Sequence, residues 1–182
     1  LSYPQTRDLV EDALARVVRE NYPDCEIVAG TSTAGIAHAA LVAQRLDLPM
    51  CYVRGSAKDH GRNNRIEGRV EAGQKAVVIE DLISTGGSVV EVVEALREAG
   101  AEVLGIASIF SYGMQRGLER LAAAQVRNIS LSDFDALCEV ASEEGYIQKS
   151  DIERLLAFRA NPSDESWMRK ACFSVKFTQP PG

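Results

Sequence analysis

Several features that would assign this chain to other classes of protein are missing from its sequence. No apolar run approaches the roughly eighteen residues that a membrane-spanning helix needs, so we expect no membrane association. The 4 cysteines are scattered without C-x-x-C spacing, which favours neither a zinc site nor a disulfide framework. Reduced thiols are typical of the cytosol, and we therefore expect a cytoplasmic protein.

Positive charge is also scarce. The 20 Lys and Arg residues are outnumbered by 26 Asp and Glu residues, and the formal net charge is −6. A nucleic-acid partner is therefore not expected, because such proteins usually carry an excess of positive charge. The region between residues 54 and 75 nevertheless concentrates basic side chains, which favours a small phosphorylated ligand. These residues are Arg54, Lys58, Arg62, Arg65, Arg69 and Lys75.

A strand, a polar loop and a helix follow one another directly in residues 77–99. The apolar β-branched residues 77–79 predict a buried strand, and the carboxylates of Glu80 and Asp81 come at its carboxyl end. A loop rich in hydroxyl groups and glycine then leads into a helix. In parallel α/β sheets, ligands bind beyond the carboxyl ends of the strands, and the amides at a helix N-terminus favour phosphate.

The two acids distinguish this loop from other phosphate-binding loops. A Walker loop needs a lysine and a dinucleotide-binding loop needs G-x-G-x-x-G, and neither pattern is present. Carboxylates beside a phosphate would repel it unless they face ribose hydroxyls or Mg²⁺. A ribose 5-phosphate therefore fits, with its hydroxyls on Glu80 and Asp81. The loop residues assigned to this ligand are Leu82, Ile83, Ser84, Thr85, Gly86, Gly87 and Ser88.

A second loop repeats the same arrangement earlier in the chain. Residues 26–29 predict a short strand, Thr31, Ser32 and Thr33 supply hydroxyl groups, and a helix is expected over residues 36–46. This loop offers a second anion site at the same end of the sheet. The alternative is an ordinary turn in which Thr33 caps the helix.

Residues 55–65 contain almost nothing apolar and cannot pack against a core. We expect a surface loop that closes over the site as a lid. Lys58, His60 and the flanking Arg54 could then bring positive charge over a leaving pyrophosphate. A polar connection without a function is the alternative.

The alternation of strands and helices predicts an α/β fold with a mainly parallel central sheet flanked by helices. We expect one domain over residues 1–160 and an irregular tail over residues 161–182, in which Trp167 anchors the tail to the domain. Further strands are expected at residues 50–54, 66–70, 103–110 and 126–131, and further helices at residues 7–20, around 118–122, from Ser132 to about 145, and at 149–160.

The twelve residues 77–88 closely resemble the phosphoribosyl pyrophosphate (PRPP) signature of the type I phosphoribosyltransferases. The pattern R-x-x-x-K-D-H-G, which begins at Arg54, is similar to the catalytic loop of the orotate phosphoribosyltransferases. Gly55 departs from it, because many members carry a lysine there, and Arg62 is a candidate replacement. The resemblance also implies a small N-terminal hood over the base, which we expect to precede Leu1 in a longer chain.

The resemblance implies transfer of ribose 5-phosphate from PRPP to orotate, giving orotidine 5′-monophosphate and pyrophosphate in UMP biosynthesis. It makes Lys58, His60 and Asp81 the expected catalytic residues, and places Ser84 next to the base. Mg²⁺ is the expected cofactor, held mainly through PRPP and by Glu80 or Asp81. A homodimer is implied, in which the mobile loop acts in the neighbouring subunit.

Two other functions remain open at this stage. One is a PRPP-sensing regulator that binds nucleic acid through the same fold, although the net acidity and the presence of Lys58 and His60 count against it. The other is a purine phosphoribosyltransferase, which base preference would distinguish.

Overall fold

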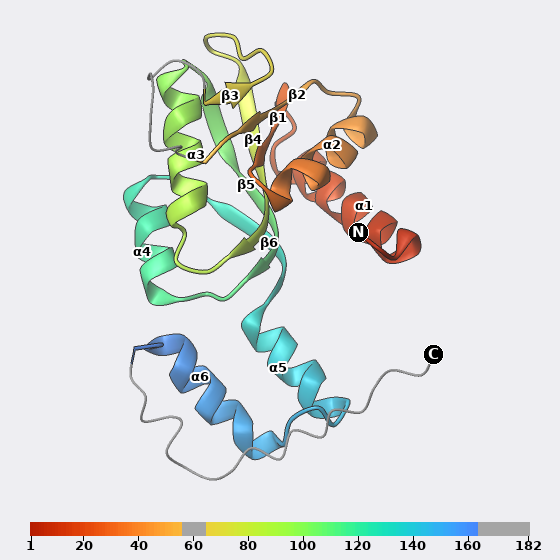
Figure 1. Cartoon of the computed structure of the whole chain (residues 1–182), viewed down its shortest axis with the longest axis vertical. Coiled ribbons are helices and arrows are strands. Elements are labelled where there is room, and N and C mark those ends of the chain that lie inside the picture. Colours follow the sequence, from red (N-terminus) through yellow and green to blue (C-terminus); the bar gives the residue numbers. More distant parts are fainter. Residues whose placement is uncertain (56–64, 164–182) are drawn as a thin grey trace.

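The computed structural model describes residues 1–55 and 65–163, and its centre is a sheet with strand order β3-β2-β1-β4-β5-β6 (Figure 1). The neighbouring strands are parallel except β2 and β3, which are antiparallel, so the predicted α/β architecture is confirmed. The strands are β1 (Ile27–Thr31), β2 (Met50–Val53), β3 (Ile66–Glu67), β4 (Lys75–Ile83), β5 (Glu102–Ser111) and β6 (Asn128–Asp133). The helices are α1 (Pro4–Asn21), α2 (Ala34–Leu46), α3 (Gly87–Glu98), α4 (Gln115–Ala123), α5 (Phe134–Glu143), the 3₁₀ turn η1 (Lys149–Asp151) and α6 (Ile152–Ala160).

Helices cover both faces of the sheet. On one face, Leu14 of α1 and Val42 of α2 pack in the same apolar cluster as Ile79 of β4. On the other face, Leu96 of α3 packs in the cluster that contains Val78 of β4. The central strands are buried on both sides, which explains their continuous runs of apolar β-branched residues.

The strand order creates a switch point between β1 and β4. From β1 the chain passes through α2 to β2, and from β4 it passes through α3 to β5 on the other side of the sheet. The loops that follow β1 and β4 therefore diverge at the carboxyl edge of the sheet. Such a divergence is where ligands bind in open α/β folds, and both predicted anion loops lie there.

The end of β4 differs from the sequence-based expectation. The strand was predicted to end at Ile79, but it continues to Ile83, so Glu80 and Asp81 lie within it. The reason is that β5 is long enough to pair with this extension, with Glu80 opposite Ser108 and Leu82 opposite Phe110. The two acids are thereby held on a rigid strand rather than in a loop.

The start of α5 also differs from the expectation. The helix was predicted to begin at Ser132, but this residue belongs to β6. Asp133 is the capping residue, and its carboxylate accepts a hydrogen bond of 2.9 Å from the amide of Ala136. An aspartate is at least as good a cap as a serine, which explains the shift by one position.

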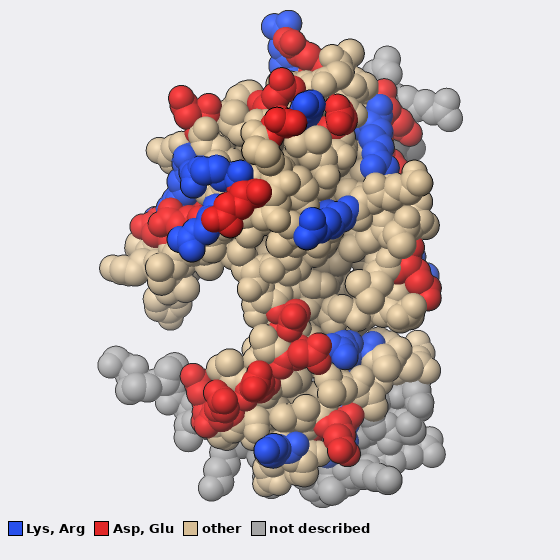
Figure 2. All heavy atoms as spheres, turned by 180° about the vertical axis from the view of Figure 1, so that it is seen from behind, with Lys and Arg blue, Asp and Glu red and all other residues tan. Residues whose placement is uncertain are grey.

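Helices α5 and α6 lie beyond β6, away from the layers of helix that cover the sheet (Figure 1). Helix α5 carries Asp135, Glu139 and Glu143 on exposed positions. Figure 2 shows the molecule from behind, with the part that contains α5 and α6 at the bottom. Acidic side chains predominate over that bottom part, whereas acidic and basic side chains are mixed over the rest of this face. The predicted tail falls largely outside the described residues, which end at residue 163, and Trp167 lies there too.

None of the helices in the two described ranges is both long and apolar enough to span a bilayer. Cys25, Cys51 and Cys138 are free thiols, and burial raises the pKa of Cys25 and of Cys51 to about 11. Cys172 lies outside the described residues.

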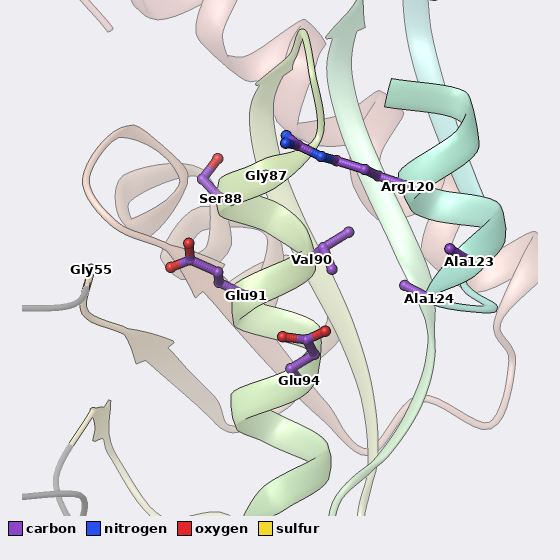
Figure 3. Close-up of a pocket in the computed structure, with 9 residues that line it drawn as sticks. All are labelled: Gly55, Gly87, Ser88, Val90, Glu91, Glu94, Arg120, Ala123 and Ala124. Carbon is purple, nitrogen blue, oxygen red and sulfur yellow. The ribbon is translucent and has the colours of Figure 1, made fainter. Parts of the chain in front are cut away.

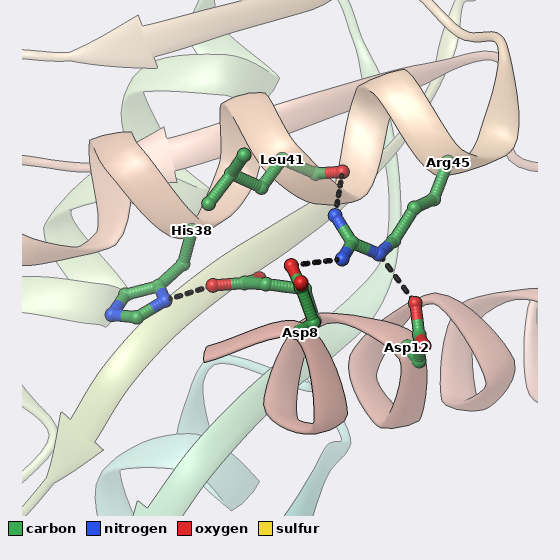
Figure 4. A network of polar contacts seen from close by, with 6 residues as sticks. Asp8, Asp12, His38, Leu41 and Arg45 are labelled. Atoms are coloured by element: carbon green, nitrogen blue, oxygen red, sulfur yellow. Dashed lines mark hydrogen bonds and ion pairs between the residues drawn. The ribbon is translucent and has the colours of Figure 1, made fainter. Parts of the chain in front are cut away.

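A buried hydrogen bond between two side chains joins α1 to α2 (Figure 4). His38 Nδ1 of α2 lies 2.6 Å from Glu11 Oε1 of α1, and Glu11 is completely buried. Closer to the surface, Arg45 donates to Asp8 at 2.9 Å and to Asp12 at 2.5 Å. No role was predicted for His38. In the structure, its ring is the hydrogen-bond partner of the buried Glu11 carboxylate.

We expect His38→Ala to lower the free energy of unfolding by about 3 kcal/mol, because it leaves the Glu11 carboxylate buried without its partner. Arg45→Ala is the matched control and should cost about 1 kcal/mol, because its ion pairs lie nearer the solvent. Urea unfolding of both variants measures the difference. Equal losses of unfolding free energy in the two variants would show that the burial of Glu11 does not determine how strongly His38→Ala destabilises the protein.

Candidate active site

A short hydrogen bond joins the two predicted anion loops at their bases. Thr31 Oγ1, at the end of β1, donates to Glu80 Oε1 of β4 at 2.6 Å. Both side chains are buried, with exposed fractions of 1% and 5%. Thr31 is therefore turned into the protein and orients Glu80, which sequence reasoning did not anticipate.

Glu80 has unusual electrostatics for a carboxylate. Burial raises its pKa to about 7, and the neighbouring Asp81 carboxyl contributes to the rise. The hydrogen bonds from Thr31 and from the Asp81 amide, the latter at 3.0 Å, partly oppose this rise. A ligand that brings a cation to Glu80 would favour its ionised form.

Asp81 and Glu80 are not equivalent, although the sequence presented them as a pair. Asp81 is partly exposed, whereas Glu80 is buried. Successive residues of a strand point to opposite faces, so Glu80 and Asp81 have different surroundings at this end of β4. Asp81 is accordingly the more accessible carboxylate for a ligand.

The loop after β4 forms an uncapped helix N-terminus. Gly86, at the N-cap of α3, has a φ of 71°, a conformation that glycine adopts without strain. No side chain caps α3, so the amides of its first turn have no partner of that kind. Gly87 and Ser88 are the first residues of the helix. This geometry suits a phosphate group.

The loop after β1 has a related geometry. Thr33 occupies the N-cap of α2, but its side chain makes no capping hydrogen bond, so the alternative of an ordinary capped turn is not supported. Gly35 packs so closely that an added Cβ would lie 2.7 Å from the Ile79 carbonyl oxygen and would also overlap the Thr31 hydroxyl. The first turn of α2 is thereby pressed against β1 and β4.

The predicted lid is anchored at this second loop. The Gly55 amide donates to Ser32 Oγ at 2.8 Å, and the Arg54 amide donates to the Arg65 carbonyl at 2.8 Å. Arg54 also forms an ion pair of 3.3 Å with Glu67. Residues 56–64, including Lys58, His60 and Arg62, lie outside the described part of the chain. Both ends of the predicted lid therefore begin beside the second anion loop.

A groove of about 750 Å³ runs along α3 and α4 beside the phosphate loop (Figure 3). It includes Gly87 and Ser88 of that loop, but neither Glu80 nor Asp81 contributes to it. Arg120 of α4 extends into the groove toward Gly87. Sequence reasoning missed Arg120, because it lies in a later helix and belongs to no local motif. The residues that line the groove are Gly55, Gly87, Ser88, Val90, Glu91, Glu94, Arg120, Ala123 and Ala124.

Comparison with known proteins identifies the class that this fold and site define. A family model described as phosphoribosyl transferase domain matches residues 2–142. The chain therefore belongs to the phosphoribosyltransferase family. The orotate phosphoribosyltransferase of Bacillus cereus (strain G9842) is 56% identical over 168 residues, which cover 92% of this chain and 80% of the relative.

Solved structures show the same relationship. Orotate phosphoribosyltransferase from Aeropyrum pernix superimposes with a TM-score of 0.71 at 29% identity, covering 80% of each chain. The UMP synthase of Leishmania donovani gives a TM-score of 0.73 at 26% identity, covering 87% of this chain and 34% of that one. Adenine phosphoribosyltransferase from Leishmania tarentolae, at 20% identity and a TM-score of 0.61, shares the fold.

The raised pKa of Glu80 predicts a pH-dependent stability for the ligand-free protein. The ordinary pKa of a glutamate is 4.5, and the pKa of Glu80 in the native protein is about 7. At pH values between these two, the native state binds more protons than the unfolded state. The free energy of unfolding should therefore fall as the pH rises through this window, by on the order of 3 kcal/mol.

Urea unfolding at a series of pH values measures this slope. Glu80→Gln should abolish it, whereas Glu94→Gln, which changes an exposed carboxylate in the same region, should retain it. The same slope in Glu80→Gln as in the wild type would rule out Glu80 as its source.

The close approach of α2 predicts that Gly35→Ala is destabilising. The new methyl group would overlap the Thr31 hydroxyl and displace it from Glu80, and we expect a loss of roughly 1–3 kcal/mol. Gly55→Ala is the control, because a Cβ there meets only Ser32 Oγ at 3.9 Å. Thermal unfolding distinguishes the two, and a Gly35→Ala variant as stable as the control would contradict the packing described here.

Proposed function

We propose that this protein transfers ribose 5-phosphate from PRPP to orotate, producing orotidine 5′-monophosphate and pyrophosphate for pyrimidine biosynthesis. The observation that carries the PRPP assignment is the Thr31–Glu80 hydrogen bond, which joins two anion loops at one switch point. The choice of orotate is supported by 56% identity over 92% of the chain to relatives of that name.

PRPP would lie across the crevice between β1 and β4. Its 5-phosphate would accept hydrogen bonds from the amides and hydroxyls of residues 84–88, and its ribose hydroxyls would lie on Asp81 and Glu80. The pyrophosphate would face Ser32, Thr33 and Arg54. Thr31 would act by orienting Glu80, because its hydroxyl already donates to that carboxylate.

In the reaction, the bond between ribose C1 and the pyrophosphate oxygen breaks, and its electron pair leaves with the pyrophosphate. A nitrogen of orotate then bonds to C1, close to Ser84, and the proton that this nitrogen carried is released to solvent. The positive charge that develops on the ribose ring would be stabilised by the carboxylates of Asp81 and Glu80. Lys58 and His60 would neutralise the leaving group and exclude water as the lid closes.

Mg²⁺ is the proposed cofactor, and the residues present are compatible with it. In the two described ranges, no group of three or more His, Cys, Asp or Glu residues could hold a metal ion by itself. Mg²⁺ commonly binds through one or two carboxylates together with substrate phosphates, and Asp81 and Glu80 could supply the former. When bound, it would neutralise charge on the leaving pyrophosphate.

We also propose a cytoplasmic homodimer in which the lid of one subunit closes over the site of its neighbour. Lys58→Ala and Asp81→Asn variants should each be nearly inactive. Mixing them should restore part of the activity, because some mixed dimers contain one site with both an intact lid and an intact Asp81. No recovery after verified subunit exchange would show that the lid acts within its own subunit.

Pyrophosphate release with PRPP, Mg²⁺ and one of four bases tests the function directly. Release with orotate, but not with uracil, adenine or hypoxanthine, is the expected result. Release with a purine would keep the PRPP site and overturn the orotate assignment. Binding of PRPP without release would favour a PRPP-sensing regulator instead.

A further inference from the structure

Arg120 contacts the phosphate loop from a separate helix. Its Nη1 donates to the Thr85 carbonyl oxygen at 3.0 Å and lies 3.4 Å from Thr85 Oγ1. The side chain is partly buried and extends from α4 toward Gly87 (Figure 3). The phosphate loop is therefore attached to α4 as well as to its own helix.

Glycines make this contact unusually close. A Cβ at Gly117 of α4 would lie 2.5 Å from the Ser84 carbonyl oxygen, and one at Gly87 would lie 3.0 Å from Arg120 Nη1. The backbone of α4 therefore packs against the start of the loop, and the guanidinium group lies against its end.

The hydrogen bond to Thr85 determines the direction of the next amide. The Thr85 carbonyl and the Gly86 N–H belong to one planar trans peptide unit, in which the two groups point in opposite directions. Because Arg120 holds the carbonyl on the side of α4, the Gly86 N–H is turned to the other side. The loop thus presents this amide in a fixed orientation before any ligand binds.

Arg120 also supplies charge that the loop lacks. Residues 82–88 contain no lysine or arginine, and the groove beside them carries Glu91 and Glu94. Within the described part of the chain, Arg120 is the one cationic residue that lines this groove. A phosphate bound at the N-terminus of α3 would otherwise depend on backbone amides and hydroxyls near two acids.

We propose that Arg120 is a positioning residue for the 5-phosphate of PRPP: it fixes the Thr85–Gly86 peptide and places a positive charge behind the loop. This inference rests on the proposed function, because it takes residues 84–88 as the phosphate site. It predicts that Arg120 affects the phosphate end of the substrate and leaves the pyrophosphate end unaffected.

Calorimetric titration with ribose 5-phosphate and, separately, with pyrophosphate tests this prediction. Arg120→Met should weaken ribose 5-phosphate binding by roughly tenfold to a hundredfold, as expected for loss of a charged hydrogen-bond donor, and leave pyrophosphate affinity unchanged. Arg116→Met is the matched control, because Arg116 is an exposed arginine on the same helix. It removes the same charge and should bind both ligands as the wild type does.

Arg120→Lys separates geometry from charge. Lysine keeps the charge but not the planar fork, so it should recover at most part of the affinity for ribose 5-phosphate. In steady-state assays, Arg120→Met should raise the KM for PRPP more than it lowers kcat. Full recovery by lysine would overturn the positioning role, as would equal weakening of both ligands, which would indicate a general structural defect.

The titrations with ribose 5-phosphate and pyrophosphate do not depend on which base the protein uses. A wild-type protein that binds ribose 5-phosphate but releases no pyrophosphate with orotate would overturn the proposed reaction and leave the Arg120 comparison valid. Unchanged ribose 5-phosphate affinity in a folded Arg120→Met variant would overturn the Arg120 inference alone. A wild type that binds no ribose 5-phosphate would also overturn it, whatever its activity with orotate.

Discussion

The hydrogen bond between Thr31 and Glu80 is the interaction on which the site depends. It connects the ends of β1 and β4, the two strands from which the chain diverges, and it holds a carboxylate inside the protein at the base of both anion loops. Burial makes this carboxylate difficult to ionise, and its pKa is correspondingly high. A cationic or hydroxyl-bearing ligand would relieve that cost, so the unliganded site is electrostatically prepared for binding.

Packing maintains this arrangement from both sides of the sheet. Gly35 allows α2 to approach Thr31 and β4, and Gly117 allows α4 to approach the phosphate loop. The two helices belong to opposite layers, yet each limits the position of one anion loop. The site is therefore formed by contacts between elements that are distant in the sequence, on a sheet whose central strands are largely buried.

The sequence predicted the parallel sheet and both loops because these depend on local patterns: β-branched runs, paired acids, and glycine before helices. It could not distinguish Glu80 from Asp81, since their different burial arises from pairing of β4 with β5 beyond Ile79. The role of Arg120 could not be predicted from the sequence either, because it depends on how α4 packs against the loop. Non-local contacts account for these differences, and the roles given to Lys58 and His60 stay predictions.

The most direct measurement of the central claim is calorimetric titration of PRPP with Mg²⁺ into Thr31→Val, which replaces the hydroxyl by a methyl group of similar size. If the Thr31–Glu80 hydrogen bond unites the two loops into one site, PRPP should bind roughly tenfold more weakly than to the wild type, while inorganic pyrophosphate binds equally well. Unchanged PRPP affinity in the folded variant would contradict the account.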